Sequence, residues 1–71
     1  MDIIKFGKVI YNELIPSSTD GRTFNKLNQK IEYKNEVYLY EKWYNDTYVE
    51  EYLDNSKGES IYRNIYNPKK S

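Results

Sequence analysis

The side chains of this sequence that could do chemistry are carboxylates, lysines, arginines and tyrosines, because histidine and cysteine are both absent. Nucleophilic catalysis needs a base beside its nucleophile, and the residues that most often fill these two roles are missing. Zinc sites built from thiolates or imidazoles are excluded for the same reason. What remains for catalysis is a pair of carboxylates that share a cleft, one of them with a raised pKa.

Carboxylates are densest between residues 36 and 60, which carry seven acidic side chains against two lysines. Glu50, Glu51 and Asp54 are expected on the exposed side of a helix over residues 47–57, where helix capping and solubility explain all three. No EF-hand spacing accompanies them, so we expect no metal site and no cofactor. The three glycines form neither a phosphate loop nor a dinucleotide fingerprint. We therefore expect that the protein is not an enzyme.

Binding is the better prospect, because the chain has nine tyrosines and one tryptophan. Tyrosine provides a large amphipathic contact area at low entropic cost and is enriched in interfaces. Some of the rings must complete a small core that is poor in leucine. Nine buried hydroxyls would each need a hydrogen-bond partner, so a few tyrosines should stay exposed beside the acidic residues.

The segment Glu36–Tyr44 alternates cleanly between the two sides of an extended chain and predicts a strand. Residues 30–34 alternate in the same way, and a tight turn at Asn35 would join the two segments into a hairpin. The tyrosines of the later strand are expected to face outward. The opposite side, expected to face the core, carries Val37, Leu39, Glu41 and Trp43.

Residues 47–57 fit either a helix or a returning strand. As a strand, the best register would set Glu41 opposite Glu51, a like-charge pair that destabilises a sheet, across a three-residue loop without glycine. As a helix, the segment would begin at a capping box formed by Thr47 and Glu50. One face of that helix would carry Tyr48, Val49, Tyr52 and Leu53. We therefore predict an amphipathic helix.

The flanking segments are less regular. Residues 2–15 are rich in β-branched and aromatic side chains, which favours a strand that ends at Pro16 over a helical stripe that must carry Gly7. Residues 23–29 fit a second short helix or an ordered loop. Residues 60–66 alternate and predict an edge strand.

The predicted fold class is α+β, a small three- to four-stranded antiparallel sheet with one amphipathic helix over about 47–57 and the optional short helix over about 23–29. Residues 1–66 make a single small domain, and 67–71 a frayed C-terminal tail. No apolar run approaches the roughly 20 residues of a membrane span, and no signal peptide is recognisable, so we expect a cytoplasmic protein without membrane contact. So short a chain buries little surface, which leaves a homodimer open.

The first functional hypothesis is a small inhibitor that binds a basic protein. Carboxylates can take the place of phosphates in the basic groove of a nucleic-acid-handling enzyme. Heavy use of lysine, asparagine, tyrosine and isoleucine indicates an AT-rich genome, and by association a phage or mobile element and an anti-defence or anti-CRISPR-like role. The residues predicted to contact the target are Glu41, Tyr44, Asp46, Tyr48, Glu50, Glu51 and Asp54.

Two alternative hypotheses stay open. A small β-rich nucleic-acid-binding module would use interleaved aromatic and basic side chains, although the acidic middle of the chain opposes direct binding of nucleic acid. Its contact residues would be Tyr62, Arg63, Tyr66, Lys69 and Lys70. A structural or assembly subunit would instead bury its tyrosines against its own copies.

Overall fold

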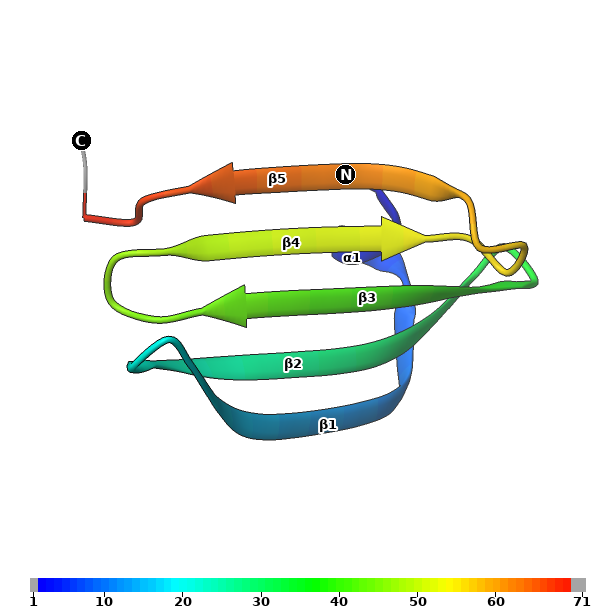
Figure 1. Ribbon diagram of the computed structural model, residues 1–71. Coiled ribbons are helices and arrows are strands. Elements are labelled where there is room, and N and C mark those ends of the chain that lie inside the picture. The colour runs from blue at the N-terminus through cyan, green and yellow to red at the C-terminus, as the bar shows by residue number, and fades with distance from the viewer. Residues whose placement is uncertain (1, 70–71) are drawn as a thin grey trace.

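The chain folds into a five-stranded antiparallel sheet with one short helix, as the computed structural model describes it for residues 2–69 (Figure 1). Strand order follows the sequence, so the sheet is a meander in which each strand pairs with the next. The elements are α1 (Asp2–Phe6), β1 (Lys8–Thr19), β2 (Arg22–Tyr33), β3 (Glu36–Tyr44), β4 (Val49–Asp54) and β5 (Ser60–Tyr66). The expected α+β fold with three or four strands and an amphipathic helix is therefore wrong.

The segment 47–57, expected to be that helix, contains strand β4 instead. β4 pairs with β3 one residue away from the register considered from the sequence, so Glu51 lies opposite Lys42 and Glu41 lies opposite Tyr52. The like-charge conflict is replaced by an opposite-charge pair, which stabilises a sheet. A shift of one residue also exchanges the faces on which the side chains of β4 lie.

A four-residue loop, residues 45–48, makes this register possible. The backbone N–H of Asn45 donates to the Tyr48 carbonyl at 2.9 Å, and Asn45 Oδ1 accepts the backbone N–H of Thr47 at 2.9 Å. An asparagine side chain that bonds the backbone two residues on is a recurrent turn device. Thr47, expected to cap a helix, is part of this turn.

Three expectations for the N-terminal half are also wrong, although residues 8–15 of the predicted strand do lie in β1. Residues 23–29 lie inside the twelve-residue strand β2, which pairs with strands on both sides, so long-range pairing outweighs their weak helical spacing. Asp2–Phe6 is a helix rather than a strand. β1 continues past Pro16, which is tolerated because β1 is an edge strand.

The first two turns of the meander have two residues each, with positive φ at both. The values are 52° and 75° at Asp20 and Gly21, and 51° and 65° at Lys34 and Asn35. This is the type I′ geometry that matches the twist of paired strands. The hairpin predicted around Asn35 and the edge strand predicted over residues 60–66 are both confirmed.

The helix α1 lies on one face of the sheet, behind β3 and β4 in Figure 1. Its Ile3 packs against a buried cluster of Ile31, Tyr40 and Leu53. The contact is close, because a Cβ atom on Gly7 would lie 2.3 Å from Ile31 Cγ2. We call this the covered face and its opposite the open face. Within residues 2–69, no helix is long and apolar enough to cross a membrane.

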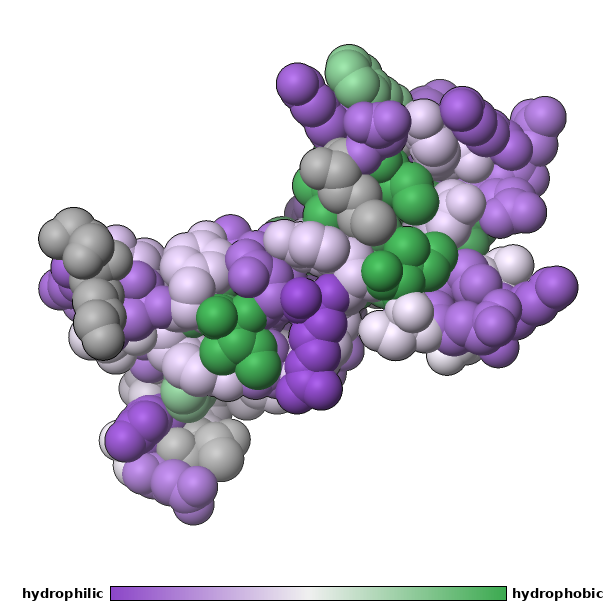
Figure 2. Space-filling view, turned by 90° about the horizontal axis from the view of Figure 1, so that it is seen from above, coloured by the Kyte–Doolittle hydropathy of each residue, from purple (hydrophilic) through white to green (hydrophobic). Residues whose placement is uncertain are grey.

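The covered face includes the tyrosine side of β3, which was expected to face solvent. Tyr40 is 7% exposed on it, whereas Leu39, expected in the core, is 48% exposed on the open face. The reason is α1, whose Ile3 packs against the buried cluster on the tyrosine side of β3. Figure 2, seen onto the β5 edge of the sheet, shows separate groups of apolar side chains at the surface. Ile61 and Ile65 of β5 are among the exposed apolar residues.

Candidate functional site

The carboxylates expected to form one acidic surface are distributed over both faces and a loop. Glu50 lies on the open face and Glu51 on the covered face, because neighbours along a strand point in opposite directions. Asp54 shares the open face with Glu50 but lies at the other end of β4, opposite Leu39. The single surface of Glu50, Glu51 and Asp54 that a helix would have formed is therefore not assembled.

Among the predicted contact residues, Glu51 and Glu41 are each engaged by other side chains of the protein. Glu51 accepts a hydrogen bond from the Tyr40 hydroxyl at 2.6 Å and one from Asn64 Nδ2 at 3.4 Å. Burial, and then this bond, raise the pKa of Tyr40 above the ordinary tyrosine value. On the open face, Glu41 Oε1 lies 3.4 Å from Lys26 Nζ. Neither carboxylate is available as an isolated negative charge.

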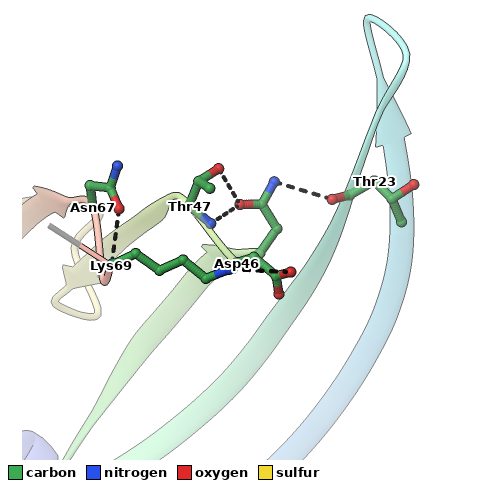
Figure 3. Close-up of polar contacts among 6 residues, drawn as sticks. Thr23, Asp46, Thr47, Asn67 and Lys69 are labelled. Carbon is green, nitrogen blue, oxygen red and sulfur yellow. Dashed lines mark hydrogen bonds and ion pairs between the residues drawn. The ribbon is translucent and has the colours of Figure 1, made fainter.

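Two further predicted contact residues, Tyr44 and Asp46, lie apart from the open face. Tyr44 is on the covered face, where Lys42 Nζ lies 5.0 Å from its ring centroid. Asp46 is in the loop 45–48 and forms an exposed ion pair of 3.9 Å with Lys69 (Figure 3). Asn45 of the same loop donates from Nδ2 to the Thr23 carbonyl at 3.3 Å. These contacts tie the loop to β2 and to the C-terminal segment.

Three aromatic rings and one carboxylate surround a hollow of about 270 Å³ on the open face. Its lining residues are Phe24, Trp43, Tyr48 and Glu50. They come from three adjacent strands and the loop before β4, and Trp43 lies directly opposite Glu50. The rings of Phe24 and Tyr48 meet edge to face, with centroids 5.8 Å apart and planes at 77°. We call this arrangement the aromatic hollow.

The polar hydrogens of the aromatic hollow are donated to carboxylates. Trp43 Nε1–H donates to Glu41 Oε1 at 2.7 Å, and the Tyr48 hydroxyl donates to Glu50 Oε2. The bond to Glu50 is the largest cause of a raised pKa at Tyr48. Lys26 Nζ lies 4.9 Å from the Trp43 ring centroid, and Glu41 neutralises it. The Trp43 and Tyr48 rings are thereby held by hydrogen bonds to carboxylates.

Two of the four residues that line the aromatic hollow were among the predicted contact residues. These are Tyr48 and Glu50, although on a helix, whereas Trp43 was assigned to the core and Phe24 to a short helix. The missing signal is the register of β2 on β3 and of β3 on β4, which brings the four residues together. Alternation within one strand carries no information on that register.

The residues of the alternative nucleic-acid hypothesis do not form one platform. Tyr62 packs against the core on the covered face, and Tyr66 shares that face. Arg63 lies on the open face, with its guanidinium carbon 5.3 Å from the Tyr52 ring centroid. Lys69 pairs with Asp46, and Lys70 lies outside the residues that the structure describes.

No family model, no curated protein sequence and no solved structure matches the chain. Over residues 2–69, no group of three or more acidic side chains is placed to hold a metal ion. Function is therefore inferred from the geometry of the open face.

Proposed function

We propose that the protein is a small, non-enzymatic protein-binding module that docks its partner on the open face of the sheet. The observation that carries this proposal is the asymmetry of the sheet. Among the described elements, α1 covers the part of one face around Ile31, Tyr40 and Leu53, whereas the other face presents the aromatic hollow together with Leu39 and Ile65, each 48% exposed. Exposed apolar area rimmed by charges is typical of protein interaction sites.

The thin core supports the same proposal. The buried residues of the described chain are Ile31, Tyr40, Val49 and Leu53. Small domains bury a low fraction of their surface and gain stability from anything that binds only the folded state. A partner on the open face would provide a second layer, in the way that two sheets or a sheet and a helix form a core.

An inhibitory role toward a nucleic-acid-handling enzyme remains compatible with such a module, but nucleic-acid mimicry has less support than a protein contact through aromatic side chains. Mimicry needs a row of free carboxylates. Here Glu50 and Glu51 lie on opposite faces, and Glu41 is paired with Lys26. We therefore base the proposal on the open face as a whole and not on its charge alone.

The test uses two exposed leucines of similar exposure on opposite faces. Leu39 is 48% exposed on the open face, and Leu14 is 54% exposed beside Leu27 on the covered face. The immobilised chain is used to capture partners from a lysate of its natural host, and captured proteins are identified by mass spectrometry. We expect Leu39→Lys to lose the captured protein and Leu14→Lys to keep it.

Equal capture by the two variants would contradict docking on the open face. Two further measurements separate the alternatives. A mobility shift that weakens steeply with salt would indicate direct nucleic-acid binding. Sedimentation of the purified chain as an oligomer would indicate a structural subunit.

A further inference from the structure

The aromatic hollow has the chemistry of a site for a cation. The faces of aromatic rings attract ammonium and guanidinium groups, and tryptophan does so most strongly. Its one charged lining residue is Glu50, which is negative when ionised. We propose that the hollow binds an arginine side chain of the partner protein, a step that rests on the proposed docking of a partner on the open face.

The hydrogen-bond state of the lining excludes an anion. Phe24 has no polar atom, the Trp43 N–H is donated to Glu41, and the Tyr48 O–H is donated to Glu50. An anion or a phosphate would need a free donor, and these lining side chains offer none. An incoming group must instead bring its own donors, which a guanidinium does.

Glu50 is positioned to accept those donors. Within residues 2–69, the hydrogen bond from Tyr48 goes to Oε2 of Glu50, which leaves Oε1 for the ligand. A guanidinium is planar, so it can stack on the Trp43 indole while its edge donates to a carboxylate. Lysine has only a compact ammonium and cannot stack in this way, so arginine fits the site better.

The open face already uses this type of contact. Lys26 lies 4.9 Å from the Trp43 ring centroid, and Arg63 lies 5.3 Å from that of Tyr52. Lys26 is ion-paired with Glu41, so it does not neutralise Glu50. Arg22 lines a neighbouring hollow together with Asp20, Phe24 and Tyr48. Arg63 lies close enough to Tyr48 for its charge to act to lower the pKa of that phenol, so both arginines could compete for the site.

Trp43 is the single tryptophan of the chain, so its fluorescence reports directly on the hollow. The probe is the capped peptide acetyl-Gly-Arg-Gly-amide, and its control replaces arginine with citrulline, which is neutral and nearly isosteric. We expect a saturable change in emission with the arginine peptide and about tenfold weaker binding of the citrulline peptide. Equal responses to the two peptides would overturn the proposal.

Two matched variants test whether the arginine peptide binds at Glu50. Glu50→Gln keeps an acceptor for the Tyr48 hydroxyl but removes the charge, and it should weaken binding of the arginine peptide about tenfold. Glu51→Gln makes the same change at the adjacent residue on the covered face and should leave binding unchanged. If the two variants weaken binding of the arginine peptide equally, the site is not in the aromatic hollow and the proposal is overturned. A capped lysine peptide that binds more tightly than the arginine peptide would overturn the choice of arginine.

The two proposals fail separately. If Leu39→Lys abolishes partner capture while the arginine peptide does not bind, the docking face stands and the arginine site is overturned. If the arginine peptide binds but neither Leu39→Lys nor Glu50→Gln reduces capture, the hollow binds a cation, and both its role toward a protein and the proposed docking face are overturned.

Discussion

The covered and open faces of the sheet differ more in what lies over them than in the residues that compose them. Both carry tyrosines, aliphatic side chains and charges, alternating along the same strands. Yet Tyr40 is 7% exposed and the adjacent Leu39 is 48% exposed. The difference comes from α1, five residues long, whose Ile3 closes over one face only. One face therefore holds the buried cluster, and the open face is the one that we propose for binding.

The largest expected effect contrasts a leucine on each face. Leu53 is fully buried on the covered face, so Leu53→Ala should lower the free energy of unfolding by about 2–5 kcal/mol. Leu39→Ala on the open face should change it by no more than about 0.5 kcal/mol. Urea unfolding followed by Trp43 fluorescence measures both.

Equal losses for the two leucines would show that the faces do not differ in their contribution to folding. If Leu53→Ala leaves no folded protein, Leu53→Met conserves volume and should cost less than about 1.5 kcal/mol. That variant keeps the comparison with Leu39→Ala measurable.

The second prediction concerns a substitution that displaces α1, the helix that makes the two faces differ. A Cβ at position 7 would lie 2.3 Å from Ile31 Cγ2 and 2.4 Å from the Ile3 carbonyl oxygen, so Gly7→Ala must push α1 away from the sheet. We expect a loss of about 1–3 kcal/mol in the free energy of unfolding. Faster hydrogen exchange at the amide of residue 7, which donates to Ile3 at 2.9 Å, should accompany it.

Gly21→Ala is the control for Gly7→Ala. It strains a turn at φ 75° with no atom within 4 Å of the new Cβ, and it should leave exchange at residue 7 unchanged. Unchanged exchange at residue 7 in Gly7→Ala itself would mean that α1 is not held by the close approach of Gly7 to Ile31.

The parts of the fold that could be predicted from sequence are those determined locally. The hairpin around Asn35 and the edge strand Ser60–Tyr66 follow from alternation and turn residues. β4 could not be identified in this way, because in a six-residue segment the apolar spacing of Val49 and Leu53 fits both a helix and a strand. The choice between them depended on a strand register that was wrong by one residue.

The residues that line the aromatic hollow come together through strand pairing, the same information that was missing for β4. Tyr48 and Glu50 were identified by their types, but their joining with Phe24 and Trp43 depends on pairing among three strands. Which face of β3 is open depends on where α1 packs, a contact between residues far apart in sequence. Neither kind of information is present in the pattern of one segment.

The third prediction compares how a tyrosine on each face changes the free energy of unfolding at alkaline pH. Burial and the bond to Glu51 raise the pKa of Tyr40, so the folded state holds this phenol proton more tightly than the unfolded state. The resulting stabilisation is complete below the unfolded pKa of about 10 and is lost as pH rises above it. We expect the free energy of unfolding to fall by up to about 1.4 kcal/mol per pH unit above pH 10 from this group.

Tyr40→Phe should flatten that slope, as measured by urea unfolding at several pH values. Tyr48 on the open face also has a raised pKa, chiefly from its bond to Glu50, but it is half-buried. Tyr48→Phe should therefore alter the slope less than Tyr40→Phe. A larger effect from Tyr48 would place the more strongly held phenol on the open face.

The smallest expected effect concerns the ion pair of the open face. Lys26 and Glu41 are partly exposed and 3.4 Å apart, so their coupling in a double-mutant cycle of Lys26→Met and Glu41→Gln should be about 0.2–1 kcal/mol and should decrease with salt. The coupling is small because water competes for both charges, although Glu41 also accepts the Trp43 N–H. A coupling well above this range would mean that the open face stabilises the fold through its polar contacts. The division of roles between the faces would then be wrong, because side chains that folding requires could not be rearranged freely by a partner.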